Sequence, residues 1–387
     1  MQGLFNDSAK TRFLVVVGTR PEAIKLSPVI IELRTKTRCT VDVVYTRQHA
    51  DLVLPIFDFF GVTVNTHVSL RRGEDVGALY SELLSELSKL IVQTRPSAVI
   101  VQGDTASACA AGMAGFLSKT PVVHVEAGLR TGDMSAPWPE EFNRRVISLG
   151  ATWHFAHSES AKANLTAEGI PGEQIVISGN TGIDAALIAE SRVGMDQRYW
   201  QEFLGKYPGL DETGDFILLT VHRRENHGQP LDYICDAIDT IVDTLGYQVV
   251  IPVHPNPEVS GRINRRFGDR DRVILTSPLN YPVFMSVMLK AKFILTDSGG
   301  IQEEAPCLGK PCVVLRESTE RQEVAELGSS LLVGASADAI VAAATRLTND
   351  AGLFREMSMR RFPFGKGDAS RIIASSLISS EVEDAAQ

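Results

Sequence analysis

The residues FLVVVGTRPEAIKLSP, positions 13–28, already contain the repeating unit of this chain. They begin with a short apolar, β-branched run and pass through a glycine into a longer stretch with helical features. Short runs of this kind alternating with helical segments are typical of βαβ units and a parallel sheet. We therefore expect Phe13–Val17 to be the first strand of such a sheet, followed by a crossover helix.

The same alternation recurs along the chain and then starts again after a polar stretch. The first series continues with Val41–Tyr45, Ser97–Gln102, Pro121–Glu126 and Trp153–Ser158. The second series comprises Phe216–His222, Tyr247–Pro255, Arg272–Pro278, Lys292–Gly300 and Pro311–Glu317. Two such series predict an α/β fold with two Rossmann-like, doubly wound parallel-sheet domains facing a cleft.

We place the domain boundary near ISGNTGIDA (Ile177–Ala185), before the polar stretch that separates the two series. The expected domains are an N-terminal one at residues 1–180 and a C-terminal one at residues 181–369. The tail, residues 370–387, is expected to be a helix. The pattern alone allows this helix to pack on either domain.

The composition excludes several classes of function. The chain has 387 residues, of which 44% are hydrophobic and 22% charged, with a net charge of −9. Such an acidic globular chain is a poor nucleic-acid binder, and its apolar runs fall short of the roughly 18 residues that span a bilayer. The five cysteines include no CxxC pair, which predicts reduced thiols, a cytoplasmic location and no metal site.

Ligands of open α/β sheets collect at the carboxyl ends of the strands, so the polar residues there are the first candidates for a site. Gly18 permits a tight turn after the first strand, and Arg20 and Lys25 bring cations to it. An ordinary solvated turn is an equal alternative. The turn lacks the GxGxxG pattern, so a dinucleotide fingerprint is weakly supported.

Two carboxylates follow neighbouring runs of the first series. Asp104 comes after the strand ending at Gln102, and Glu126 ends PVVHVE. Adjacent parallel strands lie about 4.8 Å apart, so these side chains are expected to share a small region. Like charges that close raise one pKa, which allows one group to hold a proton while the other accepts one. For Asp104 the alternative is a helix N-cap.

The segment TGDMSAPWPEEFNRR (Thr131–Arg145) adds a third carboxylate. Its long Gly- and Pro-containing loop indicates a segment shaped over a cleft rather than a plain connector. Glu140 and Arg144 are four residues apart on the helix that follows, so a surface ion pair is an alternative explanation for both.

In the second half, His222 ends the first strand beside two arginines, where it could bind phosphate or transfer a proton. LTDSGGIQEEAP (Leu295–Pro306) is the strongest local signal. The amides of Ser298, Gly299 and Gly300 are expected to point at a diphosphate, aided by the helix dipole, and Glu304 at ribose hydroxyls. The alternative is a helix capped by Ser298, with glycines for close packing.

Taken in order, the blocks of sequence resemble the non-hydrolysing UDP-N-acetylglucosamine 2-epimerase family. They are GTRPEAIKLSP, QGDT, HVEAGLRTGD, PWPEEFNR, ISGNTGIDA, HRRENHG, HPNP, LTDSGGIQEEAP, RESTER and the tail PFGKGDASRI. The resemblance implies a glycosyltransferase-B-type architecture, with the nucleotide sugar between two Rossmann-like domains and the C-terminal helix returned to the first. It also implies a homodimer, a UDP-sugar substrate, no metal and no cofactor.

The resemblance implies that UDP-GlcNAc and UDP-ManNAc are interconverted, which supplies ManNAc-type sugars for cell-surface polysaccharide. UDP leaves to give 2-acetamidoglucal and is then added back. The departing UDP builds positive character at C1 and makes the C2 proton removable, which requires cations at the diphosphate and carboxylates near C2.

The residues that match the family's catalytic positions are Asp104, Glu126, Glu140 and His222. Which carboxylate is the acid and which the base stays open. Those that match substrate-binding positions are Arg20, Lys25, Arg144, Phe284, Ser298, Gly299, Gly300, Glu304 and Arg321. Asp51 replaces a longer side chain where an activating second UDP-GlcNAc binds in many members, which predicts weak or absent activation.

Other functions remain open on this evidence. They are a hydrolysing 2-epimerase that releases ManNAc and UDP, a 2-epimerase for a modified UDP-2-acetamido sugar, a glycosyltransferase of the same fold, and a non-catalytic UDP-sugar sensor. The three carboxylates argue against the sensor, because acids near a diphosphate cost affinity unless the chemistry requires them.

Overall fold

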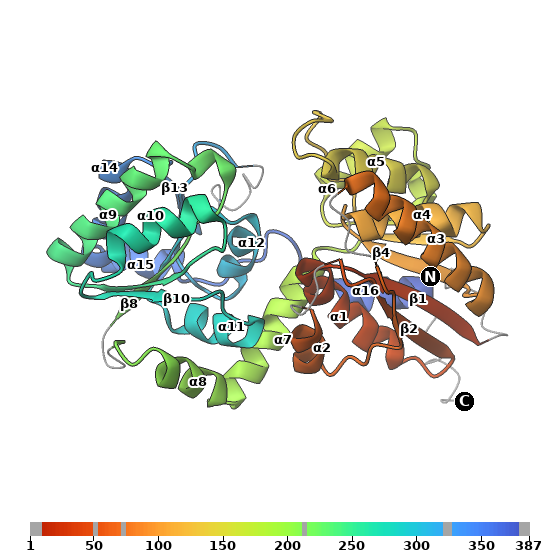
Figure 1. Ribbon diagram of the computed structural model, residues 1–387, viewed down its shortest axis with the longest axis horizontal. Coiled ribbons are helices and arrows are strands. Elements are labelled where there is room, and N and C mark those ends of the chain that lie inside the picture. Colours follow the sequence, from red (N-terminus) through yellow and green to blue (C-terminus); the bar gives the residue numbers. More distant parts are fainter. Residues whose placement is uncertain (1–9, 49–52, 71–74, 211–214, 320–326, 379–387) are drawn as a thin grey trace. The chain divides into compact units, whose positions relative to one another are not determined.

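The structure is a computed structural model that describes residues 10–48, 53–70, 75–210, 215–319 and 327–378. The chain divides into two compact units: unit 1 runs to Ala185 and resumes at Phe364, and unit 2 is Ala186–Pro363. Each unit contains one sheet whose neighbouring strands are all parallel (Figure 1). The predicted α/β class with two parallel sheets is confirmed.

The sheet of unit 1 has the strand order β3-β2-β1-β4-β5-β6-β7. Its strands are β1 (Thr11–Val17), β2 (Cys39–Tyr45), β3 (Thr66–His67), β4 (Ala98–Gln102), β5 (Val122–Ala127), β6 (Trp153–Ala156) and β7 (Ile175–Ile177). Its helices are α1 (Arg20–Arg34), α2 (Leu54–Phe60), α3 (Val76–Thr94), α4 (Ala106–Leu117), α5 (Glu140–Gly150), α6 (Glu159–Ala167) and α16 (Ala369–Leu377).

The sheet of unit 2 has the order β10-β9-β8-β11-β12-β13. Its strands are β8 (Phe216–Thr220), β9 (Gln248–Pro252), β10 (Val273–Thr276), β11 (Ile294–Thr296), β12 (Cys312–Val314) and β13 (Ser330–Leu332). Its helices are α8 (Arg198–Lys206), α9 (Gln229–Leu245), α10 (Pro257–Phe267), α11 (Tyr281–Lys290), α12 (Gly299–Cys307), α14 (Ala337–Asn349) and α15 (Ala351–Met357). Helix α7 (Thr181–Met195) begins in unit 1 and continues into unit 2.

The central strands of both sheets are buried on both faces, which explains why they read as unbroken apolar runs. Every residue of β4 and of β8 is buried. In β8, Ile217 and Leu219 face the cluster built with α9 and α14, while Phe216 on the other face stacks on Trp200 of α8. Parallel strands covered by helices on both faces have this composition.

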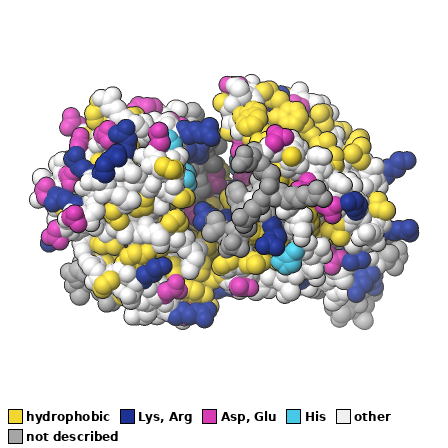
Figure 2. Space-filling model, in the orientation of Figure 1, with side chains coloured by type: hydrophobic (Ala, Val, Ile, Leu, Met, Phe, Trp, Pro, Cys, Tyr) yellow, Lys and Arg dark blue, Asp and Glu magenta, His cyan; other side chains and the backbone are white. Residues whose placement is uncertain are grey.

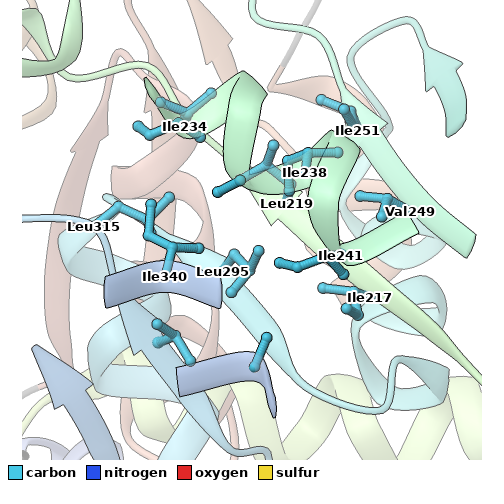
Figure 3. Close-up of a cluster of buried hydrophobic side chains, with 14 of the residues drawn as sticks. Ile217, Leu219, Ile234, Ile238, Ile241, Val249, Ile251, Leu295, Leu315 and Ile340 are labelled. Carbon is cyan, nitrogen blue, oxygen red and sulfur yellow. The ribbon is translucent and has the colours of Figure 1, made fainter. Parts of the chain in front are cut away.

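Helix α9 shows how spacing becomes packing in unit 2. Ile234, Ile238 and Ile241 recur at helical intervals, so they lie on one face of the helix. This face meets the strands in one buried cluster, to which Ile234, Ile238 and Ile241 belong together with Leu219 and Leu295 (Figure 3). The burial of these branched side chains holds the sheet and its helix together.

The C-terminal helix belongs to unit 1 because a buried carboxylate binds its first turn. Asp184 accepts hydrogen bonds from the amide of Ser370 at 2.8 Å and from the amide of Ala369 at 3.3 Å. The amide of Asn180 donates to the carbonyl of Phe364 at 2.7 Å. The contacts of both segments explain why unit 1 extends to Ala185 and resumes at Phe364, a few residues from the expected limits at 180 and 369.

Three short strands escape the sequence pattern: β3, β7 and β13 have only two or three residues each. All five cysteines are free thiols, and four of them are buried. Among the described residues, no helix combines the length and apolar character that a bilayer crossing requires.

We expect Ile238→Ala to destabilise unit 2 by about 2–5 kcal/mol, because it removes a fully buried side chain and leaves a cavity beside the sheet. Urea unfolding followed by circular dichroism measures the loss. Tyr233→Ala on the exposed side of the same helix is the control, with an expected change within about 0.5 kcal/mol. Equal midpoints for both variants would contradict the packing described above.

Candidate active site

The turn between β1 and α1 approaches the start of α4 so closely that only glycine fits at its first position. A Cβ at Gly18 would lie 2.1 Å from Oγ of Ser107 and 2.7 Å from Oγ1 of Thr46. Arg20 begins α1 with an exposed side chain, and Lys25 lies just over one turn further along the helix. This local geometry brings both predicted cations to the carboxyl end of the unit 1 sheet.

Glu126 lies on β5 and faces one of those cations. Its Oε1 accepts a hydrogen bond from Nζ of Lys25 at 2.6 Å, and its Oε2 accepts one from the side-chain Nε2 of Gln102 on β4. The backbone of Glu126 has a φ of 62°, in the left-handed region, at the point where the register between β5 and β6 shifts. Such a conformation is uncommon in residues other than glycine, and functional sites are one of the places where it occurs.

Asp104 is held on the neighbouring turn, immediately after β4. Its carboxylate pairs with the guanidinium of Arg144, and its carbonyl accepts from Nδ2 of Asn143 at 2.7 Å. Burial is the main reason that the pKa of Asp104 lies above its ordinary value; Arg144 lowers it, and Glu126 and Glu140 raise it. The expected neighbourhood of Asp104 and Glu126 therefore exists.

The N-cap alternative for Asp104 is wrong. The cap of α4 is Thr105, whose hydroxyl accepts from the amide of Ala108 at 3.0 Å. Because the next residue takes the capping position, the carboxylate of Asp104 is available to meet Arg144. The sequence QGDT offers two capping residues in succession, and only the backbone conformation distinguishes them.

The surface ion pair between Glu140 and Arg144 is also wrong. Arg144 lies on the buried face of α5, where it contacts Asp104 and, at 3.4 Å, Oε2 of Glu141. Within the described parts of the chain, the buried Oε2 of Glu140 has no hydrogen-bond partner. A buried carboxylate oxygen without a protein donor is costly, and a catalytic role or a bound water or ligand accounts for such an atom.

Several residues around this cluster carry polar contacts that the motifs alone did not assign. They are Gln102 and Asn143, described above, together with His124 and Glu22. Nε2 of His124 lies 2.8 Å from the carbonyl of Gly103, and burial lowers the pKa of this histidine to about 3. All four residues lie within the sequence blocks that resemble the family, and this position was the only sign in the sequence that they belong to the site.

In unit 2, the residues after β8 and β11 are joined through Asp297, which is fully buried. Its carboxylate accepts from the amide of His222 at 3.0 Å, the amide of Arg223 at 2.9 Å and Nδ2 of Asn226 at 3.0 Å. Nδ1 of His222 lies 3.3 Å from Oδ1 of Asp297, and its ring stacks on that of His254. The predicted histidine is thus positioned by Asp297, which lies in the block LTDSGGIQEEAP and was not among the predicted site residues.

Helix α12 begins next to this cluster with the predicted glycines. Ser298 occupies the N-cap position, but its side chain makes no capping hydrogen bond. The alternative in which Ser298 serves as a side-chain cap of this helix therefore does not hold. A Cβ at Gly300 would lie 4.0 Å from both Oγ of Ser298 and Oε1 of Glu304, so these groups flank an open backbone surface at the helix start. Amides in the first turn of a helix lack intrahelical acceptors and suit a phosphate group.

The remaining predicted residues divide between the units. Phe284 lies on α11 and is partly buried. Tyr281, in the same helix, has a pKa well above its ordinary value because of burial and the nearby Glu304. Arg321 and Asp51 lie outside the described residues. The structure therefore places Lys25, Asp104, Glu126, Glu140 and Arg144 in unit 1. In unit 2 it places His222 after β8, and Ser298, Gly299, Gly300 and Glu304 at the N-cap and in the helix α12.

Burial also has a marked effect on Glu22, whose pKa rises to about 7 although hydrogen bonds from Thr105, Thr19 and Gly18 oppose the shift. In the folded chain this group holds a proton at pH values where the unfolded chain has lost it. Its contribution to stability is complete below the ordinary pKa of 4.5 and is lost as the pH rises through about 7.

Glu22→Gln removes this ionisation. We expect the wild type to lose on the order of 3 kcal/mol more unfolding free energy than the variant between about pH 5 and about pH 8. Urea unfolding at several pH values in that range measures the difference. Glu32→Gln, on the same helix, is the control and should follow the wild-type pH dependence. Parallel curves for wild type and Glu22→Gln would contradict the assignment.

Comparisons with known proteins agree on one family. A sequence model of the family described as UDP-N-acetylglucosamine 2-epimerase matches residues 31–378. A relative named UDP-N-acetylglucosamine 2-epimerase, from Salmonella typhimurium, is 39% identical over 373 residues, which cover 96% of this chain and 99% of the relative.

Solved structures give the same result. UDP-GlcNAc 2-epimerase from Neisseria meningitidis, bound to UDP-GlcNAc, has a TM-score of 0.87 and 37% identity, covering 95% of this chain and 99% of that one. The enzyme from Methanocaldococcus jannaschii, in complex with UDP-GlcNAc and UDP, has a TM-score of 0.78 and 30% identity, covering 94% and 98% respectively.

Proposed function

Because the chain belongs to the UDP-N-acetylglucosamine 2-epimerase family, we propose that it interconverts UDP-GlcNAc and UDP-ManNAc as a non-hydrolysing isomerase. The observation that carries the proposal is the group of three carboxylates in unit 1, in which Glu126 and Glu140 lie near enough to raise the pKa of Asp104. The relatives solved with UDP-GlcNAc or UDP support the choice of substrate.

In the proposed reaction, the bond between C1 of the sugar and UDP breaks while a carboxylate takes the proton from C2. The product is 2-acetamidoglucal. UDP then adds back to C1, and a proton returns to C2 on the opposite face. The reaction needs one group that accepts a proton and one that supplies it, each placed near C2.

The surroundings of the carboxylates suit these two tasks. The ammonium of Lys25 contacts Glu126 and favours a carboxylate that accepts a proton. Burial raises the pKa of Asp104, so this side chain holds a proton at a higher pH than an ordinary aspartate. We assign no fixed order to the three groups, since the epimerisation is reversible and each role exchanges with direction.

The diphosphate requires positive charge and amide donors as the leaving group departs. In the proposal, Arg20 and His222 bind the phosphates, and the first amides of α12 cradle the diphosphate. Phe284 and Glu304 serve the uridine end, with Glu304 accepting hydrogen bonds from ribose hydroxyls.

Purified protein incubated with UDP-GlcNAc in heavy water, followed by proton NMR, tests this function. We expect UDP-ManNAc to form with deuterium at C2 in both sugars, because the abstracted proton exchanges with solvent. Asp104→Asn should slow turnover by about 10²–10⁴-fold, whereas Glu86→Gln on the exposed side of α3 should not.

Other outcomes would replace the proposal. Free ManNAc would indicate the hydrolysing reaction, and turnover only with an acceptor a glycosyltransferase. Turnover of a modified UDP-2-acetamido sugar alone would show that this sugar, and not UDP-GlcNAc, is the substrate. A UDP-sugar that binds but is not changed would indicate a sensor.

We also infer that two copies associate through the outer surface of α4 and α5. Phe116 and Leu117 on α4 are 61% and 65% exposed, and Leu149 on α5 is 80% exposed. The ends of the two helices meet, because a Cβ at Gly150 would lie 3.4 Å from Cβ of Phe116. Figure 2 shows hydrophobic side chains gathered on this face of unit 1. Contiguous apolar patches of this kind mark interaction surfaces.

Leu149→Glu places a charge in that patch and should convert a dimer into monomers in sedimentation velocity at micromolar concentration. Met195→Glu is the matched control, since Met195 is 78% exposed on α7 but lies in unit 2. A wild type that sediments as a monomer, or a Leu149→Glu variant that stays dimeric, would contradict the inferred interface.

A further inference from the structure

We propose that Glu22 is a positioning residue that ties the turn after β1 to the turn after β4, and thereby sets Arg20 and Asp104 in a fixed relation. The inference rests on the proposed function, in which Arg20 serves the diphosphate and Asp104 the sugar. Glu22 itself lies inside the protein, only 1% exposed, so it acts through its neighbours rather than on the substrate.

The two carboxylate oxygens of Glu22 face different turns. Oε2 accepts from the amide of Gly18 at 3.0 Å, the amide of Thr19 at 2.7 Å and the hydroxyl of Thr19 at 2.8 Å. Oε1 accepts from the hydroxyl of Thr105 at 2.7 Å. The first set holds the residues just before Arg20, and the second contact reaches the residue just after Asp104.

The turn that carries Asp104 is fixed residue by residue. His124 contacts the carbonyl of Gly103, Asn143 donates to the carbonyl of Asp104, and Thr105 donates to Glu22. The first two contacts come from β5 and α5. Glu22 therefore supplies a hydrogen bond from α1, the helix that also carries Arg20 and Lys25.

We call the contact between Glu22 and Thr105 the bridge. In it the Thr105 hydroxyl acts both as a donor and as an acceptor. Its proton goes to Glu22, while its lone pair accepts from the amide of Ala108 and caps α4. Valine at this position has nearly the same shape but can neither donate nor accept. Serine can do both, so the pair of substitutions separates the hydroxyl from the volume of the side chain.

A buried carboxylate at this place is unfavourable for stability above neutral pH, as its raised pKa shows. A glutamine reproduces the bridge without ionisation, because its carbonyl can face Gly18 and Thr19 while its amide donates to Thr105. A methionine fills the same space and removes every hydrogen bond. Loss of the bridge leaves each site residue present but free to shift, and small misplacements of reacting groups reduce rates strongly.

The experiment measures kcat and KM for UDP-GlcNAc in the full-length protein with Glu22→Met, Glu22→Gln and Glu32→Met. We expect Glu22→Met to lower kcat by at least about 30-fold while KM changes by less than about 3-fold, since positioning acts on the transition state. Glu22→Gln should recover most of the lost kcat. Glu32→Met, a control on the same helix, should match the wild type.

Thr105→Val and Thr105→Ser test the contact from the side of Thr105. They decide whether the contact positions the site if Glu22→Met does not fold. Thr105→Val should lower kcat by at least about 10-fold, and Thr105→Ser should retain it. In the double variant Glu22→Met/Thr105→Val the loss should be no greater than in the worse single variant, because both substitutions break the same contact between Glu22 and Thr105. Multiplicative losses, or a folded Glu22→Met or Thr105→Val with wild-type kcat, would overturn the proposal.

Failure of the proposed function gives a different result. A wild type that does not epimerise UDP-GlcNAc refutes the function before any variant is compared. In that case amide hydrogen exchange tests the contacts of Glu22. The backbone amides of residues 18–19 should exchange faster in Glu22→Met than in the wild type and in Glu32→Met. Unchanged exchange at these amides would refute the bridge itself.

Discussion

The partly buried carboxylates Asp104 and Glu126 of unit 1 are each met by a cation from a different helix at the carboxyl ends of the strands. Lys25 reaches Glu126 from α1, and Arg144 reaches Asp104 from α5. Removing either cation would leave its partly buried carboxylate without a compensating charge, which is unfavourable. The same contacts that make the site chemically useful thus also fix how α1 and α5 pack on the sheet.

Unit 2 handles its buried carboxylate differently. Asp297 accepts hydrogen bonds from backbone and side-chain amides. One of these donors is the backbone amide of His222, so the same contact holds His222 in place. The negative charge is satisfied inside the unit, so the start of α12 keeps its positive dipole end for a ligand. One unit concentrates acids with paired cations, and the other presents donors. This contrast matches a proposed division between sugar chemistry and nucleotide binding.

Backbone conformation adds a second constraint. Glu126 adopts a left-handed conformation at a register shift, which costs on the order of 1–3 kcal/mol and turns the side chain toward Gln102 and Lys25. Gly18 permits a backbone approach that any side chain would block. Both features place polar groups at the edge of the sheet, where a parallel arrangement leaves strand ends side by side.

The sequence by itself determined the two series of strands, because buried parallel strands must be apolar and are separated by helices of sufficient length to cross over. It also determined which polar residues follow those strands, since that depends only on order along the chain. It did not reveal the short strands β3, β7 and β13 because, unlike the equally short β11 and β12, they do not lie in one of the apolar runs of the two series.

Only the tertiary structure decided the pairing of charges. Spacing along α5 allowed Arg144 to meet Glu140, but the rotation of the helix against the sheet buried Arg144 and brought it to Asp104. Likewise, nothing in the order of residues connects Glu22 with Thr105, or His222 with Asp297, because they are 83 and 75 positions apart. Such contacts depend on how elements pack in space, and packing is a property of the whole fold.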